Sequence, residues 1–99
     1  MRAPDVSHWT ASDLRRALTG TDTCDAVCCG TPVWFATDGE LYAVVVYPPG
    51  RDAIEEIVAT PEAALSRARA LCREHAPAAW DSWQTEENIA SGLQGALWL

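Results

Sequence analysis

The sequence predicts a small α+β domain in which a short antiparallel sheet packs against helices. Two β-rich runs, residues 32–37 and 40–47, flank the dipeptide Asp38-Gly39. Asp-Gly between two such runs is a strong hairpin signal, because both residues of a two-residue turn adopt positive φ. Farther along, Thr60 and Pro61 begin an amphipathic helix. Thr is a good N-cap, and Pro suits the first helical position.

Two further helical segments flank this centre. Thr10, followed three residues later by Asp13, predicts the capped start of an N-terminal helix. The long helix after residue 60 is expected to end at Pro77, which cannot continue it. The remaining tail, residues 77–99, is predicted to be helical or irregular. If it is helical, Thr85 marks an acceptable start, and the tail is a candidate docking element.

The sheet is predicted to be a meander of three or four strands. Residues 25–29 and 54–59 supply strands in addition to the hairpin. A two-residue turn would place Phe35 opposite Tyr42. Both faces of the hairpin would then be apolar. The hairpin is therefore either covered on both sides or exposes one face as a binding surface.

The length of 99 residues predicts one domain over residues 1–99. The formal net charge is −7, and residues 21–60 carry most of it, with one Arg against seven acids. Such a field repels nucleic acid and favours basic partners. The sequence has no apolar run of membrane-spanning length and no apolar leader. We expect a cytoplasmic protein that contacts neither membrane nor nucleic acid directly.

The cysteines are the first candidates for chemistry. Three thiols and one imidazole would suffice for tetrahedral zinc. The spacing lacks the tight pairs of a zinc ribbon, so buried thiols are the simpler prediction, with no metal and no cofactor. If a metal does bind, its ligands come from Cys24, Cys28, Cys29, Cys72 and His75.

No catalytic motif is recognisable. A cysteine nucleophile needs a His base and an orienting group, and no glycine-rich nucleophile turn surrounds a thiol here. Glu55 and Glu56 are neighbours on a predicted strand, so they point to opposite faces and cannot act as an acid–base pair. The sequence also lacks a P-loop and a dinucleotide-binding glycine fingerprint. We therefore expect a protein that is not an enzyme.

These observations favour a small acidic protein-binding module. Antitoxins, immunity proteins and viral or plasmid-borne anti-defence inhibitors neutralise basic, nucleic-acid-directed partners with such surfaces. Five Trp residues in 99 add candidate anchors, because Trp is enriched at interfaces. The expected partner-binding residues are Asp22, Asp25, Asp38, Glu40, Asp52, Glu55, Glu56, Trp83 and Trp98.

Two alternatives stay open at this point. One is a zinc-stabilised or thiol-dependent small domain built on the cysteines. The other is an accessory subunit of a larger complex, docked through its tail. The sequence leaves open whether residues 80–99 pack on their own core or on another chain, and whether the protein forms a homo-oligomer.

Overall fold

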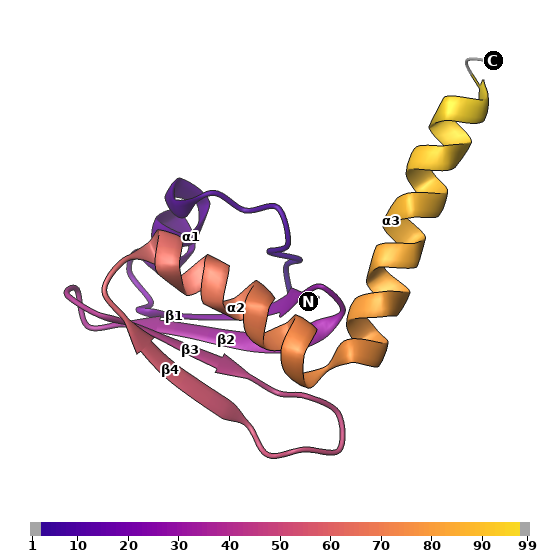
Figure 1. Cartoon of the computed structure of the whole chain (residues 1–99). Coiled ribbons are helices and arrows are strands. Elements are labelled where there is room, and N and C mark those ends of the chain that lie inside the picture. The colour runs from indigo at the N-terminus through magenta and orange to yellow at the C-terminus, as the bar shows by residue number, and fades with distance from the viewer. Residues whose placement is uncertain (1–2, 98–99) are drawn as a thin grey trace.

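Four strands form one antiparallel sheet whose order, β1-β2-β3-β4, follows the chain (Figure 1). The computed structural model describes residues 3–97, and the side chains of residues 3–89. The strands are β1 (Thr23–Cys28), β2 (Thr31–Thr37), β3 (Tyr42–Val46) and β4 (Ile54–Val58). The predicted α+β class and antiparallel meander are confirmed.

Three helices complete the described chain: α1 (Ala11–Leu18), α2 (Pro61–His75) and α3 (Pro77–Leu97). Helix α2 lies along the sheet and contacts all four strands, while α1 packs beside it on β1 and β2. Both helices cover the same face of the sheet (Figure 1). Helix α3 contacts the end of α2 and then extends away from the sheet (Figure 1).

The two predicted helix starts are confirmed in detail. The Thr10 hydroxyl accepts from the Asp13 N–H at 3.3 Å, and the Asp13 carboxylate accepts from the Thr10 N–H at 2.9 Å. This reciprocal box satisfies two N–H groups that the first turn leaves unpaired. The backbone hydrogen bond from Thr10 lowers the pKa of Asp13. At α2 the Thr60 hydroxyl accepts from the Ala63 N–H at 3.1 Å.

The last helix starts earlier than the sequence suggests. The sequence predicts a helical or irregular tail with Thr85 as an acceptable helix start, whereas α3 begins at Pro77. Pro77 does end α2 as predicted, with Ala76 as the C-cap. Proline lacks an N–H, and the first turn of a helix needs none. The same residue therefore ends one helix and begins the next.

The predicted register of the hairpin is also wrong. Phe35 pairs with Val44 rather than with Tyr42, and Tyr42 pairs with Thr37. The connection is the four-residue loop 38–41 rather than a two-residue turn, which shifts the pairing by two residues. Side chains alternate with period two along a strand. A shift of two therefore leaves every residue on the face where the sequence placed it.

Side-chain hydrogen bonds stabilise this wider loop. The Asp38 carboxylate accepts from the N–H groups of Glu40 and Leu41, each at 2.8 Å. The Thr37 hydroxyl donates to the Leu41 carbonyl at 2.8 Å and accepts from the Gly39 N–H at 3.0 Å. Gly39 has φ of +97°, but Asp38 is not in the positive-φ region. These hydrogen bonds favour the four-residue loop over a tight Asp-Gly turn.

A two-residue turn does occur, between β1 and β2. Cys29 and Gly30 form it with φ of 51° and 83°, which matches the two positive values that a type I′ turn requires. The Cys29 N–H donates to the buried Ser7 hydroxyl at 2.9 Å. A Cβ on Gly30 would lie 3.2 Å from the Ala79 carbonyl oxygen. Glycine therefore allows the first turn of α3 to approach this hairpin.

The two edges of the sheet differ. The N-terminal segment runs beside β1, where the Val6 N–H donates to the Val27 carbonyl and the Val27 N–H donates to the Pro4 carbonyl, both at 2.8 Å. Strand β4 forms the other edge, and within the described chain no further strand pairs with it. The core lies between the sheet and the helices, with Phe35 fully buried at its centre.

Candidate functional site: the open face of the sheet

The face of the sheet turned away from α1 and α2 has no helix of the described chain over it (Figure 1). Alternation along each strand directs a second set of side chains to it. Val45 is shielded by its neighbours, with 7 % of its surface exposed, yet it does not belong to the core cluster between sheet and helices. We call this surface the open face; it comprises the strand residues Asp25, Trp34, Ala36, Ala43, Val45, Glu55 and Ile57, together with Leu41 of the hairpin loop, which lies beside Ala36, Ala43 and Ile57.

One row of the open face crosses the whole sheet. Asp25 of β1 lies opposite Trp34, Trp34 lies opposite Val45, and Val45 lies opposite Glu55 of β4. The two central residues are apolar and the two outer residues are acidic. Both acids are exposed, on the two edge strands. This arrangement of an apolar centre and a charged rim is typical of protein interfaces.

A hollow of about 430 Å³ lies at the hairpin end of this face. Ala36 and Ala43 are paired across β2 and β3 and line the hollow. Their small side chains leave space between the larger Leu41 and Ile57, which are 47 % and 56 % exposed. Asp38 also lines it. The hollow has room for a large apolar side chain, and it carries an acid at its rim.

The predicted acidic residues distribute around this face. Asp25 and Glu55 lie on it, and Asp38 and Glu40 lie in the loop at its hairpin end. Asp22 lies at the same end, because its carbonyl accepts from the Thr37 N–H at 2.9 Å.

The last two predicted acids lie elsewhere. Asp52 lies in the β3–β4 loop, at the opposite end of the sheet from the hairpin loop. Glu56 points to the helix-covered face, as its position next to Glu55 predicts. There the Glu56 carboxylate accepts two hydrogen bonds from Arg67 of α2, each at 2.7 Å. Glu56 is therefore part of the contact between sheet and helix.

The predicted tail anchors lie apart from the open face. Trp83 is half-buried against the core, and its ring centroid is 5.3 Å from that of Trp80 and 6.0 Å from that of His8. The first turns of α3 thus pack on their own domain, whereas Ile89 farther along is 57 % exposed. Trp98 lies outside the described residues.

Three of the four cysteines are buried. Cys28, Cys29 and Cys72 are fully buried, and the Cys28 and Cys29 sulfurs are 3.9 Å apart. Interaction with the neighbouring thiol of Cys72 raises the pKa of Cys28, and the same interaction lowers the pKa of Cys72. Burial raises the pKa of Cys29 and of Cys24. All four cysteines carry free thiols.

The metal alternative depends on bringing these thiols together with His75. Among the described residues, no group of three His, Cys, Asp or Glu side chains is placed to hold a metal ion. His75 lies in the last turn of α2, with its Nε2 3.8 Å from a carboxylate oxygen of Glu74.

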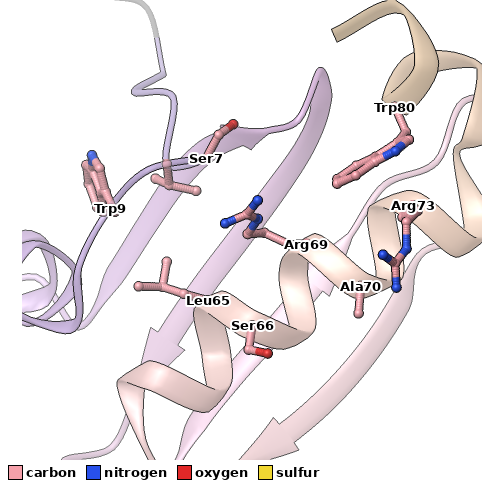
Figure 2. A pocket seen from close by; sticks show the side chains of 9 residues that line it. Ser7, Trp9, Leu65, Ser66, Arg69, Ala70, Arg73 and Trp80 are labelled. Atoms are coloured by element: carbon pink, nitrogen blue, oxygen red, sulfur yellow. The ribbon is translucent and has the colours of Figure 1, made fainter. Parts of the chain in front are cut away.

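A second hollow lies on the helical side, between the N-terminal segment, α2 and the start of α3 (Figure 2). Its volume is about 450 Å³. The sequence did not predict this hollow. Arg69 and Arg73 lie on the polar side of an amphipathic helix, and nothing in the sequence indicates that this side faces Trp9 or Trp80. The spacing of four residues between the two arginines was the available signal, because it places them on one helix face.

Comparison with known proteins adds no family to this description. No family model, no curated protein and no solved structure matches the chain. In the described part of the chain, no helix combines the length and the apolar character that crossing a membrane requires.

Proposed function

We propose that the protein is an acidic binding module that docks a basic protein partner on the open face. The observation that carries this proposal is the cross-strand row, in which Trp34 and Val45 lie between Asp25 and Glu55. Beside this row the apolar side chains of Leu41 and Ile57 are exposed, and exposed apolar side chains gathered on one uncovered face mark an interaction surface. The acidic rim selects a partner whose charge is opposite.

The geometry supports a particular mode of docking. An apolar side chain of the partner enters the hollow beside Leu41 and Ile57, where it is removed from water. A basic side chain of the partner pairs with Asp25 and lies against the ring of Trp34, because arginine combines a carboxylate contact with stacking on an aromatic face. A second basic side chain pairs with Glu55 on the other edge strand.

We propose further that this docking neutralises a nucleic-acid-directed partner in the cytoplasm. The charge of −7 supports this, since a surface that attracts a basic groove also repels nucleic acid. The module then competes with nucleic acid for the partner. An accessory subunit would differ, because it would bind the partner whether or not nucleic acid is present.

Matched variants test the docking surface. Ile57→Asp introduces a charge beside the hollow, and Ile89→Asp is its control, since both isoleucines are exposed to a similar extent, 56 % and 57 %. Tagged wild type and both variants are used to capture partners from native lysate. We expect a basic protein that wild type and Ile89→Asp retain and that Ile57→Asp loses. Equal capture by all three would contradict docking on the open face.

Kinetics with the captured partner then test the charges. The double variant Asp25→Arg/Glu55→Arg should slow association several-fold at low salt, a rough expectation for electrostatic steering. Glu86→Arg on α3 serves as the charge control. Added duplex nucleic acid should displace the module from its partner. Undiminished binding in its presence would favour the accessory subunit, and loss of self-association in Ile57→Asp would assign the face to a second copy of this chain.

A further inference from the structure

The groove on the helical side of the molecule combines aromatic walls with positive charge. It lies between the N-terminal segment, α2 and the start of α3, and its volume is about 450 Å³, which is within the range of small-molecule sites. Figure 2 shows Trp9 and Trp80 on two sides of it and the guanidinium of Arg69 rising from α2 between them. The lining residues are Val6, Ser7, Trp9, Leu65, Ser66, Arg69, Ala70, Arg73 and Trp80.

The two arginines of the groove have no acidic partner in the described chain. No carboxylate there lies within 4.0 Å of the guanidinium nitrogens of Arg69 or Arg73, whereas Arg15 and Arg67 each pair with a glutamate. None of the nine residues that line the groove is acidic. In a chain with twice as many acids as arginines, two arginines on one helix face that have no carboxylate partner among the described side chains form a local positive site.

The walls of the groove are held in place by the core. Trp9 and Trp80 are half-buried and pack against the core cluster, and Val6 and Leu65, which also line the groove, are buried. The Arg73 guanidinium carbon lies 5.8 Å from the centroid of the Trp80 ring, a distance at which cation and ring attract each other. The groove is therefore formed before any ligand binds, which reduces the entropy cost of binding.

We propose that this groove binds a small ligand that joins a flat aromatic ring to a phosphate group. Arg69 and Arg73 supply planar donor forks, which match phosphate oxygens with two hydrogen bonds each. An indole wall supplies the surface on which a flat ring stacks. A nucleotide and a phosphotyrosine side chain share this chemistry. The net negative charge of the chain does not prevent binding, because charges are screened over roughly 8 Å at physiological salt.

Titration with adenosine monophosphate tests the site. Binding is followed by calorimetry and by the indole N–H signals of Trp9 and Trp80 in nuclear magnetic resonance spectra. Adenosine and inorganic phosphate are titrated as the two halves of the ligand. We expect the monophosphate to bind about tenfold or more tightly than either half, as one or two added charge-assisted hydrogen bonds would produce. Phosphotyrosine is titrated in parallel, and the tighter of the two ligands identifies the natural source of the chemistry.

Variants connect the binding to the two arginines. Arg69→Gln and Arg73→Gln should each weaken binding about tenfold, and Arg51→Gln in the β3–β4 loop, another exposed arginine, should leave it unchanged. Both groove arginines are exposed, so the variants should keep the native circular dichroism spectrum. The proposal is overturned if neither phosphorylated ligand shifts the Trp9 or Trp80 signals at millimolar concentration. It is also overturned if inorganic phosphate binds as tightly as the monophosphate, or if Arg51→Gln weakens binding as much as Arg69→Gln.

Discussion

Arg67 of α2 holds Glu56 of β4 with two parallel hydrogen bonds, one from Nε and one from a terminal guanidinium nitrogen, each 2.7 Å long. Both side chains are partly exposed, 41 % for Arg67 and 30 % for Glu56. The pair ties the last strand to the helix that follows it. Glu55, the neighbour of Glu56, points to the open face, and no arginine among the described side chains forms an ion pair with it.

This pair predicts a pH dependence of stability. The hydrogen bonds from Arg67 lower the pKa of Glu56 below the ordinary value of a glutamate carboxyl. The unfolded chain therefore binds a proton at Glu56 more readily than the folded chain does. The pair contributes its full stabilisation to the folded state at pH values above the unfolded-state pKa. It is lost as pH falls through the lower folded-state pKa. Urea midpoints of wild type and Glu56→Gln should differ at pH 7 and converge on acidification. The same substitution at Glu55 should change the midpoint little, and a constant difference at all pH values would contradict the prediction.

A buried hydroxyl on β2 predicts a stabilising substitution. Thr31 is fully buried, and within the described chain its Oγ1 makes no hydrogen bond of ordinary length, although the hydroxyl helps to lower the pKa of the Cys72 thiol. Replacing it with the isosteric valine removes a polar atom that lost its water on folding. Thr31→Val should raise the free energy of unfolding by about 1–2 kcal/mol.

The same substitution at the other end of β2 provides the control. The Thr37 hydroxyl makes two hydrogen bonds in the hairpin loop, so Thr37→Val should lower the free energy of unfolding by about 1 kcal/mol. Urea denaturation followed by tryptophan fluorescence measures both variants. Destabilisation by Thr31→Val of similar size to that by Thr37→Val would show that the buried hydroxyl is satisfied.

The hairpin loop predicts a purely conformational effect. Gly39 has φ of +97°, and a Cβ there would meet no atom within 4 Å. Any loss of stability on substitution therefore comes from the backbone rather than from a clash. Gly39→Val should lower the free energy of unfolding by about 1–2 kcal/mol, because an L-residue is strained in the left-handed region. Gly39→Asn should cost less, since Asn tolerates this region. Equal urea midpoints for wild type and the valine variant would contradict the positive φ.

The sequence predicted the order of elements because local signals determine it. The Thr10 and Thr60 caps and the apolar alternation of the strands each act within a few residues. The faces were also correct, since a register shift of two residues does not change them. The register itself was not predictable from the Asp-Gly signal, because the side chains of Asp38 and Thr37 stabilise a longer loop.

The two candidate sites depend on contacts between distant segments, so they were less accessible to sequence reasoning. Both faces of the hairpin are apolar, and only the placement of α2 shows which face stays uncovered. Acidic clustering pointed to Asp25 and Glu55 but also to Glu56, which the structure ties to Arg67. The groove is lined by residues from three segments that are distant in the sequence. No pattern along the chain predicts that Arg69 lines the same groove as Trp9 and Trp80.

The agreement between strand order and chain order has a consequence for how the protein reaches its fold. Each strand pairs with the next strand to be synthesised, so no strand waits for a partner from a distant part of the chain. Short sequence separations reduce the entropy lost on loop closure and favour fast folding. Unpaired strands and the exposed side chains of Leu41 and Ile57 are the parts most prone to aggregate in a growing chain. The meander shortens the interval during which the strands remain unpaired.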